Sequence, residues 1–153
     1  MRTRRPTLDE ATIIRRATTS LDARARAERH GELSLNSVSV LGRIMTQGPL
    51  TPGELARQLR MLPQSLTRPL AALERAGLVR RTPDPADRRG ALLAATAAGR
   101  RALRREMAPR TRWLADAIDA VCDEDDLATL LQAAQIMQRL AGFDGGGVAP
   151  VEP

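Results

Sequence analysis

Aromatic residues are almost absent from this sequence of 153 residues, which contains one Phe, one Trp and no Tyr. Hydrophobic residues nevertheless make up 42% of the chain, so any core has to be built from aliphatic side chains. The length suits one domain with a proper core. An aliphatic composition arranged in stripes of helical period predicts that this domain is mainly helical.

Cysteine and long apolar runs are also scarce. Cys122 is the only cysteine, so an internal disulfide is excluded. No apolar run approaches the roughly 18 residues of a membrane-spanning helix. The first ten residues, MRTRRPTLDE, lack the apolar region of a secretory signal. We therefore expect a cytoplasmic protein with no membrane partner, and we interpret Cys122 as a packing residue rather than a redox sensor.

Residues that carry catalysis are missing in any convincing arrangement. His30 is the only histidine, and one histidine cannot complete a metal site. We interpret it as a helix-terminal or surface residue, with contact to a small ligand as the alternative. The sequence has no Ser/His/Asp set in a plausible context and no glycine-rich phosphate loop leading into a helix. We therefore expect no enzymatic activity, no metal and no cofactor.

Lysine is absent, so all 24 basic residues are arginines, and their distribution is uneven. Residues 1–111 contain 22 arginines against 10 acidic residues, a net charge of +12, whereas residues 112–153 carry −6. A basic region of this kind suits a phosphate backbone. An arginine-rich composition can equally produce a solvated surface, so charge alone leaves both interpretations open.

Residues 50–96 carry the most informative pattern. Thr51 can cap a helix that has Pro52 at its first position and Glu54 three residues after the cap, which is the arrangement of a capping box. This pattern predicts a short helix over residues 52–59, followed by a tight connection to a second helix.

The second helix is predicted over residues 63–76, with Gly77 as its C-terminal stop. Three leucines at i, i+4 and i+7 form an inward stripe, whereas the opposite face is polar, small or basic. A helix-turn-helix places such a face in the DNA major groove. The stripe consists of Leu66, Leu70 and Leu73, and the opposite face of Gln64, Thr67, Arg68, Ala71 and Arg75.

A β-hairpin is predicted after this helix. Residues 78–82 and 91–95 form its strands, and a turn rich in proline and aspartate joins them. The end of the turn is basic, with Arg88 and Arg89 directly after Asp87. A hairpin with a basic tip beside a helix-turn-helix is typical of a wing.

Together these segments resemble the winged helix-turn-helix of the MarR family of bacterial transcription regulators. The resemblance covers about residues 7–142, and its most specific motif, D-x-R, falls on Asp87 and Arg89. One departure is Pro69 inside the recognition helix, where a proline normally costs about 3 kcal/mol; we expect a bend or a tolerated kink there. The matching segments are GELA at 53–56, SLTR at 65–68, LERAGLVRR at 73–81 and DPADRR at 84–89.

The flanking sequences are predicted to be helical as well. Thr7 and Glu10 can form a capping box for a helix reaching about Arg29, and Thr96 can cap a long helix reaching about Val121. Asp123 can cap a final helix. Residues 35–47 show partial strand-like alternation, but an unbroken helical stripe before Gly48 and Pro49 favours a helix. The terminal stripes are too long for one small domain to cover, so we expect them to need a partner.

The resemblance implies a single, mainly α domain with a small β-hairpin wing. Its winged helix-turn-helix occupies residues 35–96, dimerisation helices occupy residues 7–34 and 97–142, and residues 143–153 form a flexible tail. The implied function is that of a homodimeric repressor that binds a pseudo-palindromic operator in double-stranded DNA. The implied DNA-binding residues are Gln64, Ser65, Thr67, Arg68, Arg75, Asp87, Arg88 and Arg89.

The resemblance also implies a small aromatic or amphipathic effector, whose contact residues the sequence leaves unknown. The effector would lodge between the dimerisation helices and the winged region and change the separation of the two recognition helices. Two alternatives remain open at this point. The winged helix could be a protein-interaction module, or it could be an architectural DNA binder without sequence preference.

Overall fold

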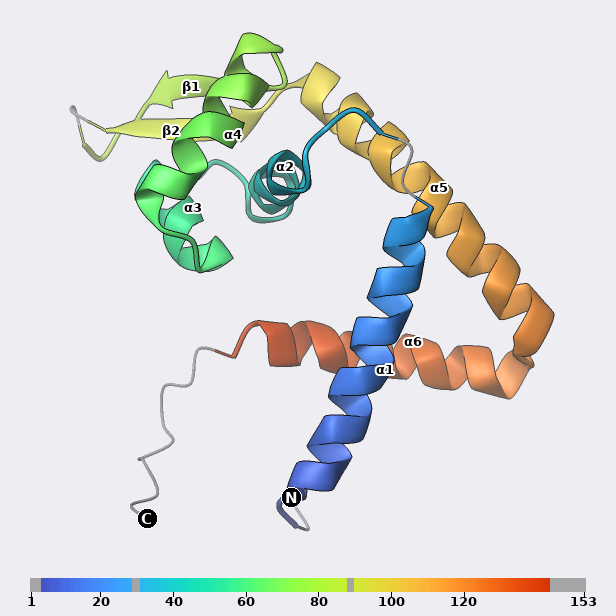
Figure 1. The fold of residues 1–153 in the computed structure, drawn as a ribbon. Helices are drawn as coiled ribbons and strands as arrows, with labels where there is room; N and C mark the ends of the chain where they lie inside the picture. Colours follow the sequence, from blue (N-terminus) through green and yellow to red (C-terminus); the bar gives the residue numbers. More distant parts are fainter. Residues whose placement is uncertain (1–3, 29–30, 88–89, 144–153) are drawn as a thin grey trace. The chain divides into compact units, whose positions relative to one another are not determined.

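The computed structural model of the chain describes residues 4–28, 31–87 and 90–143. The chain divides into two compact units, residues 1–113 and 114–153. The expected fold class, mainly α with one small hairpin, is confirmed (Figure 1). In chain order the elements are α1 (Leu8–Ala27), α2 (Leu35–Gln47), α3 (Pro52–Leu59), α4 (Pro63–Arg75), β1 (Val79–Pro83), β2 (Ala91–Ala95), α5 (Ala97–Val121) and α6 (Glu124–Ala141).

Three helices begin at the caps that the sequence predicts, and each cap forms a capping box, that of Asp123 included. Thr7, Thr51 and Asp123 each accept a hydrogen bond from the backbone N–H three residues later. In return, the acidic side chain at that third position accepts from the backbone N–H of the cap. At α3 the backbone N–H and the hydroxyl group of Thr51 both donate to the carboxylate of Glu54. These bonds, of which the backbone bond has the larger effect, lower the pKa of Glu54.

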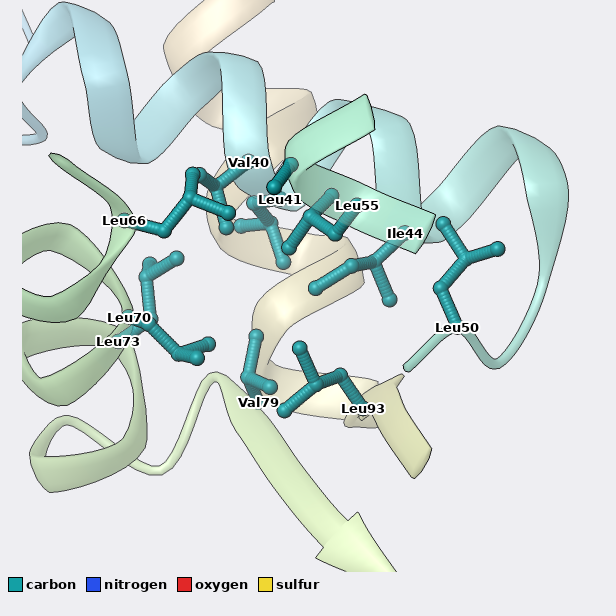
Figure 2. Close-up of a cluster of buried hydrophobic side chains, with 11 residues drawn as sticks. Val40, Leu41, Ile44, Leu50, Leu55, Leu66, Leu70, Leu73, Val79 and Leu93 are labelled. Carbon is teal, nitrogen blue, oxygen red and sulfur yellow. The ribbon is translucent and has the colours of Figure 1, made fainter. Parts of the chain in front are cut away.

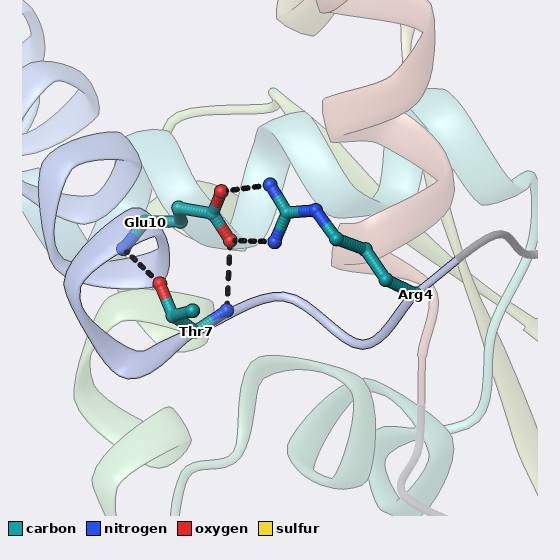
Figure 3. Close-up of polar contacts among 3 residues, drawn as sticks. All are labelled: Arg4, Thr7 and Glu10. Atoms are coloured by element: carbon teal, nitrogen blue, oxygen red, sulfur yellow. Dashed lines mark hydrogen bonds and ion pairs between the residues drawn. The ribbon is translucent and has the colours of Figure 1, made fainter.

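The capping box of α1 is extended by an arginine. The Nη1 atom of Arg4 donates to Oε2 of Glu10 at 2.8 Å, and its Nη2 atom pairs with Oε1 of the same carboxylate (Figure 3). The backbone N–H of Thr7 donates to this carboxylate at 2.8 Å. The bond from Arg4, followed by the bond from Thr7, lowers the pKa of Glu10 to about 2. Local polar contacts therefore hold the start of α1.

The aliphatic core lies in the winged region. Helices α2, α3 and α4 pack against one another and against the hairpin, and their apolar side chains meet in a single cluster (Figure 2). Leu50, between α2 and α3, forms an isolated β-bridge with Leu93 of β2 and so ties the hairpin to this cluster. The clustered residues are Val40, Leu41, Ile44, Leu50, Leu55, Ala56, Leu66, Leu70, Leu73, Val79 and Leu93.

Pro69 does not interrupt α4, because the helix runs unbroken from Pro63 to Arg75. The proline ring is buried on the same side as the inward leucines. Pro69 has no N–H group to donate to the carbonyl oxygen of Ser65, and Ser65 itself is exposed. The lost helical bond is thus offset in part by burial of an apolar ring. Of the two expected outcomes, a proline tolerated within the helix agrees with this geometry.

The end of α4 explains a shift of one residue in the hairpin. Gly77 has φ +67°, its N–H donates to Glu74, and the N–H of Leu78 donates to Leu73, both at 2.9 Å. These bonds are those of a Schellman motif. Because Leu78 closes the helix, β1 begins at Val79 rather than at Leu78 as expected. The strand extends instead to Pro83, which pairs with Ala91.

The terminal helices are very different from the winged region. Neither α1 nor α6 has a single buried residue in the isolated chain. Large apolar side chains are exposed along both helices, for example Ile13 at 67% and Leu131 at 60%. No helix in the described part of the chain is long and apolar enough to cross a membrane.

Candidate nucleic-acid interface

Helix α4 has two clearly different faces. Its three inward leucines are at most 4% exposed and belong to the core cluster. The predicted polar face is exposed along its whole length, as the helical spacing requires. The packed leucines therefore fix which side of α4 is available to a partner. The exposed residues are Gln64, Ser65, Thr67, Arg68, Ala71 and Arg75.

The start of α4 has no side-chain cap. Arg60 ends α3 in the left-handed conformation with φ 51°, and the N–H of Met61 then donates to Ala56 at 3.0 Å. Leu62 occupies the cap position of α4, where it provides no side-chain hydrogen bond. Pro63 follows without an N–H group, and the N–H of Ser65 donates to the carbonyl oxygen of Leu62 at 2.9 Å. This end of α4 therefore presents mainly the positive end of the helix dipole, which favours a phosphate group.

The structure places Arg68 beside a second element that sequence reasoning missed. A hollow of about 420 Å³ is lined by Arg68 together with Ser34 and Asn36 at the start of α2. Ser34 caps α2 through the N–H of Ser37, at 3.1 Å. This cap is visible in the sequence, but its approach to Arg68 depends on how α2 packs against α4. Asn36, which is exposed, is therefore an additional candidate for contact with a ligand of α4.

Arg75 lies at the other end of α4 and is used differently. Its Nε atom donates to the carbonyl oxygen of Ala71 at 3.3 Å, so the side chain runs back along its own helix. The remaining guanidinium nitrogens make no hydrogen bond among the described residues. Arg75 is thus in position to present positive charge near the C-terminal end of the polar face.

The described part of the hairpin turn is organised by two aspartates. The carboxylate of Asp84 accepts from the N–H of Ala86 at 2.9 Å, and the carbonyl oxygen of Asp87 accepts from the N–H of Gly90 at 2.9 Å. The predicted DNA-binding residues Arg88 and Arg89 lie outside the described residues. Asp87 is exposed, as a tip residue should be.

One further arginine connects the hairpin to the recognition helix. Arg81 of β1 forms an ion pair with Glu74 of α4, and both side chains are partly exposed. Sequence reasoning did not identify this pair, because the two residues lie on different elements on either side of the turn at Gly77. The pair is one contact between β1 and α4. Arg80, its exposed neighbour, adds positive charge to the same strand.

Known proteins with the same pattern were found in sequence and in structure. A model of the MarR family matches residues 32–90. An uncharacterized HTH-type transcriptional regulator of Mycobacterium bovis is 33% identical over 108 residues, which make up 71% of this chain and 75% of that protein.

Two solved structures extend the comparison to the flanking helices. A transcriptional regulator protein from Pseudomonas aeruginosa is 35% identical with a TM-score of 0.73, covering 91% of this chain and 100% of that one. A cysteine-to-serine variant of MarR from E. coli, crystallised with operator DNA, is 23% identical. Its TM-score of 0.59, over 87% of this chain and 99% of that one, shows a shared fold.

Proposed function

This chain belongs to the MarR family of DNA-binding transcription regulators, and we propose that it acts as a homodimeric repressor whose hold on a pseudo-palindromic operator responds to a small ligand. It is a regulator rather than an enzyme. The observation that carries the proposal is the exposed polar face of α4, which three buried leucines hold outward. Such a face can enter a major groove without any rearrangement of the core.

The residues of α4 divide by the part of DNA they would reach. Side chains in the N-terminal half of a recognition helix contact base edges, so we assign this role to Gln64, Thr67 and Arg68. Arg68 can form a bidentate pair with guanine, the commonest specific contact. Ser65 at the exposed helix start, and Arg75 near its end, are placed to bind backbone phosphates, which position the protein without reading sequence.

The wing is proposed to contact the neighbouring minor groove. Asp87 would orient the guanidinium group of Arg89, and Arg88 would add a phosphate contact. A narrow, A·T-rich minor groove has an enhanced negative potential that attracts arginine. The E. coli MarR variant crystallised with operator DNA has the same fold, which supports DNA as a partner of this fold.

Dimerisation is supported by the exposed apolar stripes of α1 and α6. A soluble chain does not normally leave so many large aliphatic side chains uncovered, and extended apolar surfaces mark interfaces. A two-fold dimer would cover the same stripes on both copies and hold two recognition helices at a fixed distance. The exposed side chains on these stripes include Ile14 and Leu21 of α1, and Leu127, Leu130, Leu131 and Met137 of α6.

A candidate place for the aromatic or amphipathic effector is a hollow of about 480 Å³ at one side of α5. Its walls are mostly apolar, with Leu33 from the segment before α2 and Leu78 from the segment after α4. Glu106, which is 5% exposed, supplies one buried carboxylate. A ligand here would lie between the recognition helix and α5, so it could change the separation of two recognition helices in a dimer.

The test is a gel shift with the DNA upstream of the chain's own gene, in the presence and absence of excess competitor DNA. A sequence-specific regulator retains its operator when unrelated duplex is added, whereas an architectural binder is competed away. A protein-interaction module binds neither the upstream DNA nor the competitor DNA. Either of the last two outcomes would overturn the proposal, and a transcription assay with and without the protein would then separate repression from activation.

A further inference from the structure

A cluster of arginines surrounds a second hollow at the start of α5. Arg101, Arg104 and Arg105 are all exposed and occupy positions i, i+3 and i+4, which places them on one face of the helix. They line a hollow of about 450 Å³ whose other walls are Leu78 and Ala98, both partly buried. The hollow therefore combines an apolar floor with a rim of three positive charges.

No acidic side chain forms an ion pair with this rim within the described residues, although Glu32 and Glu106 line an adjoining hollow with Arg105. None of the ion pairs between described residues includes Arg101, Arg104 or Arg105. The next acid along the helix, Glu106, directs its carboxylate toward Gly31, where it fills the space that a Cβ would take. The neighbouring Arg100 makes a hydrogen bond within the chain, because its Nη1 atom donates to the carbonyl oxygen of Ala95 at 3.0 Å. Like charges at these spacings repel one another, and a bound anion would relieve that repulsion.

We propose that this hollow binds a small phosphorylated molecule, with the phosphoryl group at the three arginines and an organic body on Leu78 and Ala98. Guanidinium groups match phosphate oxygens with paired, charge-assisted hydrogen bonds. Three positive charges around one site suit a group of charge close to −2 better than a single carboxylate. The volume of about 450 Å³ is in the range of small-molecule sites.

The location of the hollow favours a small ligand over the phosphate backbone of the operator. Leu78 directly follows the C-terminal end of α4, and this helix of 13 residues is about 20 Å long. The bases are read from the opposite, N-terminal end. Helix α5 also starts at the base of the hairpin, where Val79 pairs with Ala95, and not at its tip. Both elements thus place the arginines away from the base-reading start of α4 and from the tip of the wing.

The hollow adjoins the place where the residues after α4 contact the start of α5. The hydroxyl group of Thr96 donates to the carbonyl oxygen of Gly77 at 2.7 Å, and its N–H donates to that of Leu78 at 3.0 Å. Gly99 packs so closely that a Cβ would lie 2.1 Å from the carbonyl oxygen of Leu78. A ligand that contacts Leu78 and α5 together would stiffen this joint. Any effect of this ligand on DNA affinity rests on the proposed function, whereas binding of the ligand to the hollow does not.

Calorimetric titration of the full chain with adenosine 5′-monophosphate and with inorganic pyrophosphate tests the site, with acetate as an anion that lacks both a phosphoryl group and an aromatic ring. We expect both phosphorylated probes to bind and acetate to bind at least about tenfold more weakly. Arg104→Gln should weaken binding about tenfold, and the double change R101Q/R104Q should abolish it. Arg112→Gln, an equal loss of charge at an exposed position of α5 outside the hollow, should leave binding unchanged.

Three results would overturn the inference. The first is that neither phosphorylated probe binds, and the second is that Arg112→Gln weakens binding as much as Arg104→Gln, which would indicate only a general charge effect. The third is that R101Q/R104Q weakens operator binding in the absence of any probe, because the arginines would then contact DNA. Circular dichroism of each variant establishes that it is folded. If no operator is bound while the probes bind as expected, the proposed function fails and this site stands.

Discussion

The winged region and the terminal helices use similar apolar residues with opposite results. In the winged region Val40, Leu41, Leu55 and Leu93 are 0% exposed. In α6, by contrast, Leu127 and Leu131 are 40% and 60% exposed, although they lie four residues apart on one face of the helix. The difference is the presence or absence of a second layer within the same chain. A periodic stripe therefore predicts which face of a helix will be covered, but not which chain covers it.

The winged region and the terminal helices differ in what stabilises them. Elements that meet in one cluster stabilise one another within the chain, so the winged region has its own source of cooperativity. Helices α1 and α6 have capped starts but no buried side chain, and a single helix is only marginally stable without packing. Their order should therefore depend on a second copy.

A pair of leucine substitutions within α2 tests the core directly. Leu41→Ala should lower the free energy of unfolding by about 2–5 kcal/mol, because it leaves a cavity in a closely packed cluster. Leu35→Ala, on the same helix but at a position that is 47% exposed, should lower it by about 1 kcal/mol or less. Chemical denaturation measures both values. Equal losses would show that the winged region is not the independently packed part of the chain.

Leu131→Glu tests whether a second copy covers α6. A carboxylate on the apolar stripe would have to be buried in the dimer, which costs several kcal/mol, so we expect the variant to be a monomer. Gln132→Glu adds the same charge beside the stripe and should remain a dimer. Light scattering coupled to size-exclusion chromatography gives the masses. A well-behaved monomer of the unchanged chain would contradict the dimer.

Arg68→Ala tests the specificity of the winged region without altering its core. Loss of a bidentate base contact should cost about 1–3 kcal/mol of operator affinity and relax the preference at one base pair. The dimer mass should not change. Arg15→Ala, at an exposed position of α1, provides the control for the loss of one charge. A uniform loss over all operator variants would reassign Arg68 to a phosphate.

Arg89→Ala tests the wing separately from the helix. We expect weaker binding to all DNA sequences. The slope of the logarithm of the binding constant against the logarithm of the salt concentration should become shallower by about one, because one phosphate contact that releases a counterion is lost. Its effect should add to that of Arg68→Ala, since the two side chains are assigned to different grooves. Titrations at several salt concentrations measure the slope. Unchanged affinity at physiological salt would remove the wing from the DNA interface.

The smallest effect concerns the start of α1, which local contacts hold in place of packing. Because the folded pKa of Glu10 is about 2, below its ordinary value of 4.5, its contribution is present above pH 4.5 and is lost as pH falls through 2. Arg4→Ala should raise the pKa of Glu10, since the bond from Arg4 is the largest cause of the shift. NMR titration of the Glu10 carboxyl carbon measures this change. An unaltered pKa would assign the shift to the Thr7 backbone instead.

Local patterns in the sequence predicted the ends of the elements to within about two residues, the largest difference being α1, which ends at Ala27 rather than near Arg29. Thr7, Thr51 and Asp123 were recognisable as caps because a capping box joins residues only three positions apart. Gly77 was recognisable as a helix stop for the same local reason. The polar face of α4 followed from helical geometry alone, and so most of the candidate DNA-binding surface was predictable.

Which distant groups meet depends on tertiary packing. The pair of Arg81 with Glu74, the approach of Arg68 to the start of α2, and the bond of Thr96 to Gly77 all depend on how separate elements pack. The same holds for the three arginines around Leu78, which a sequence shows only as a charged run on a helix. A periodic pattern specifies the direction of a side chain from its own helix axis. The neighbour it meets depends on the packing of another element, which no local pattern encodes.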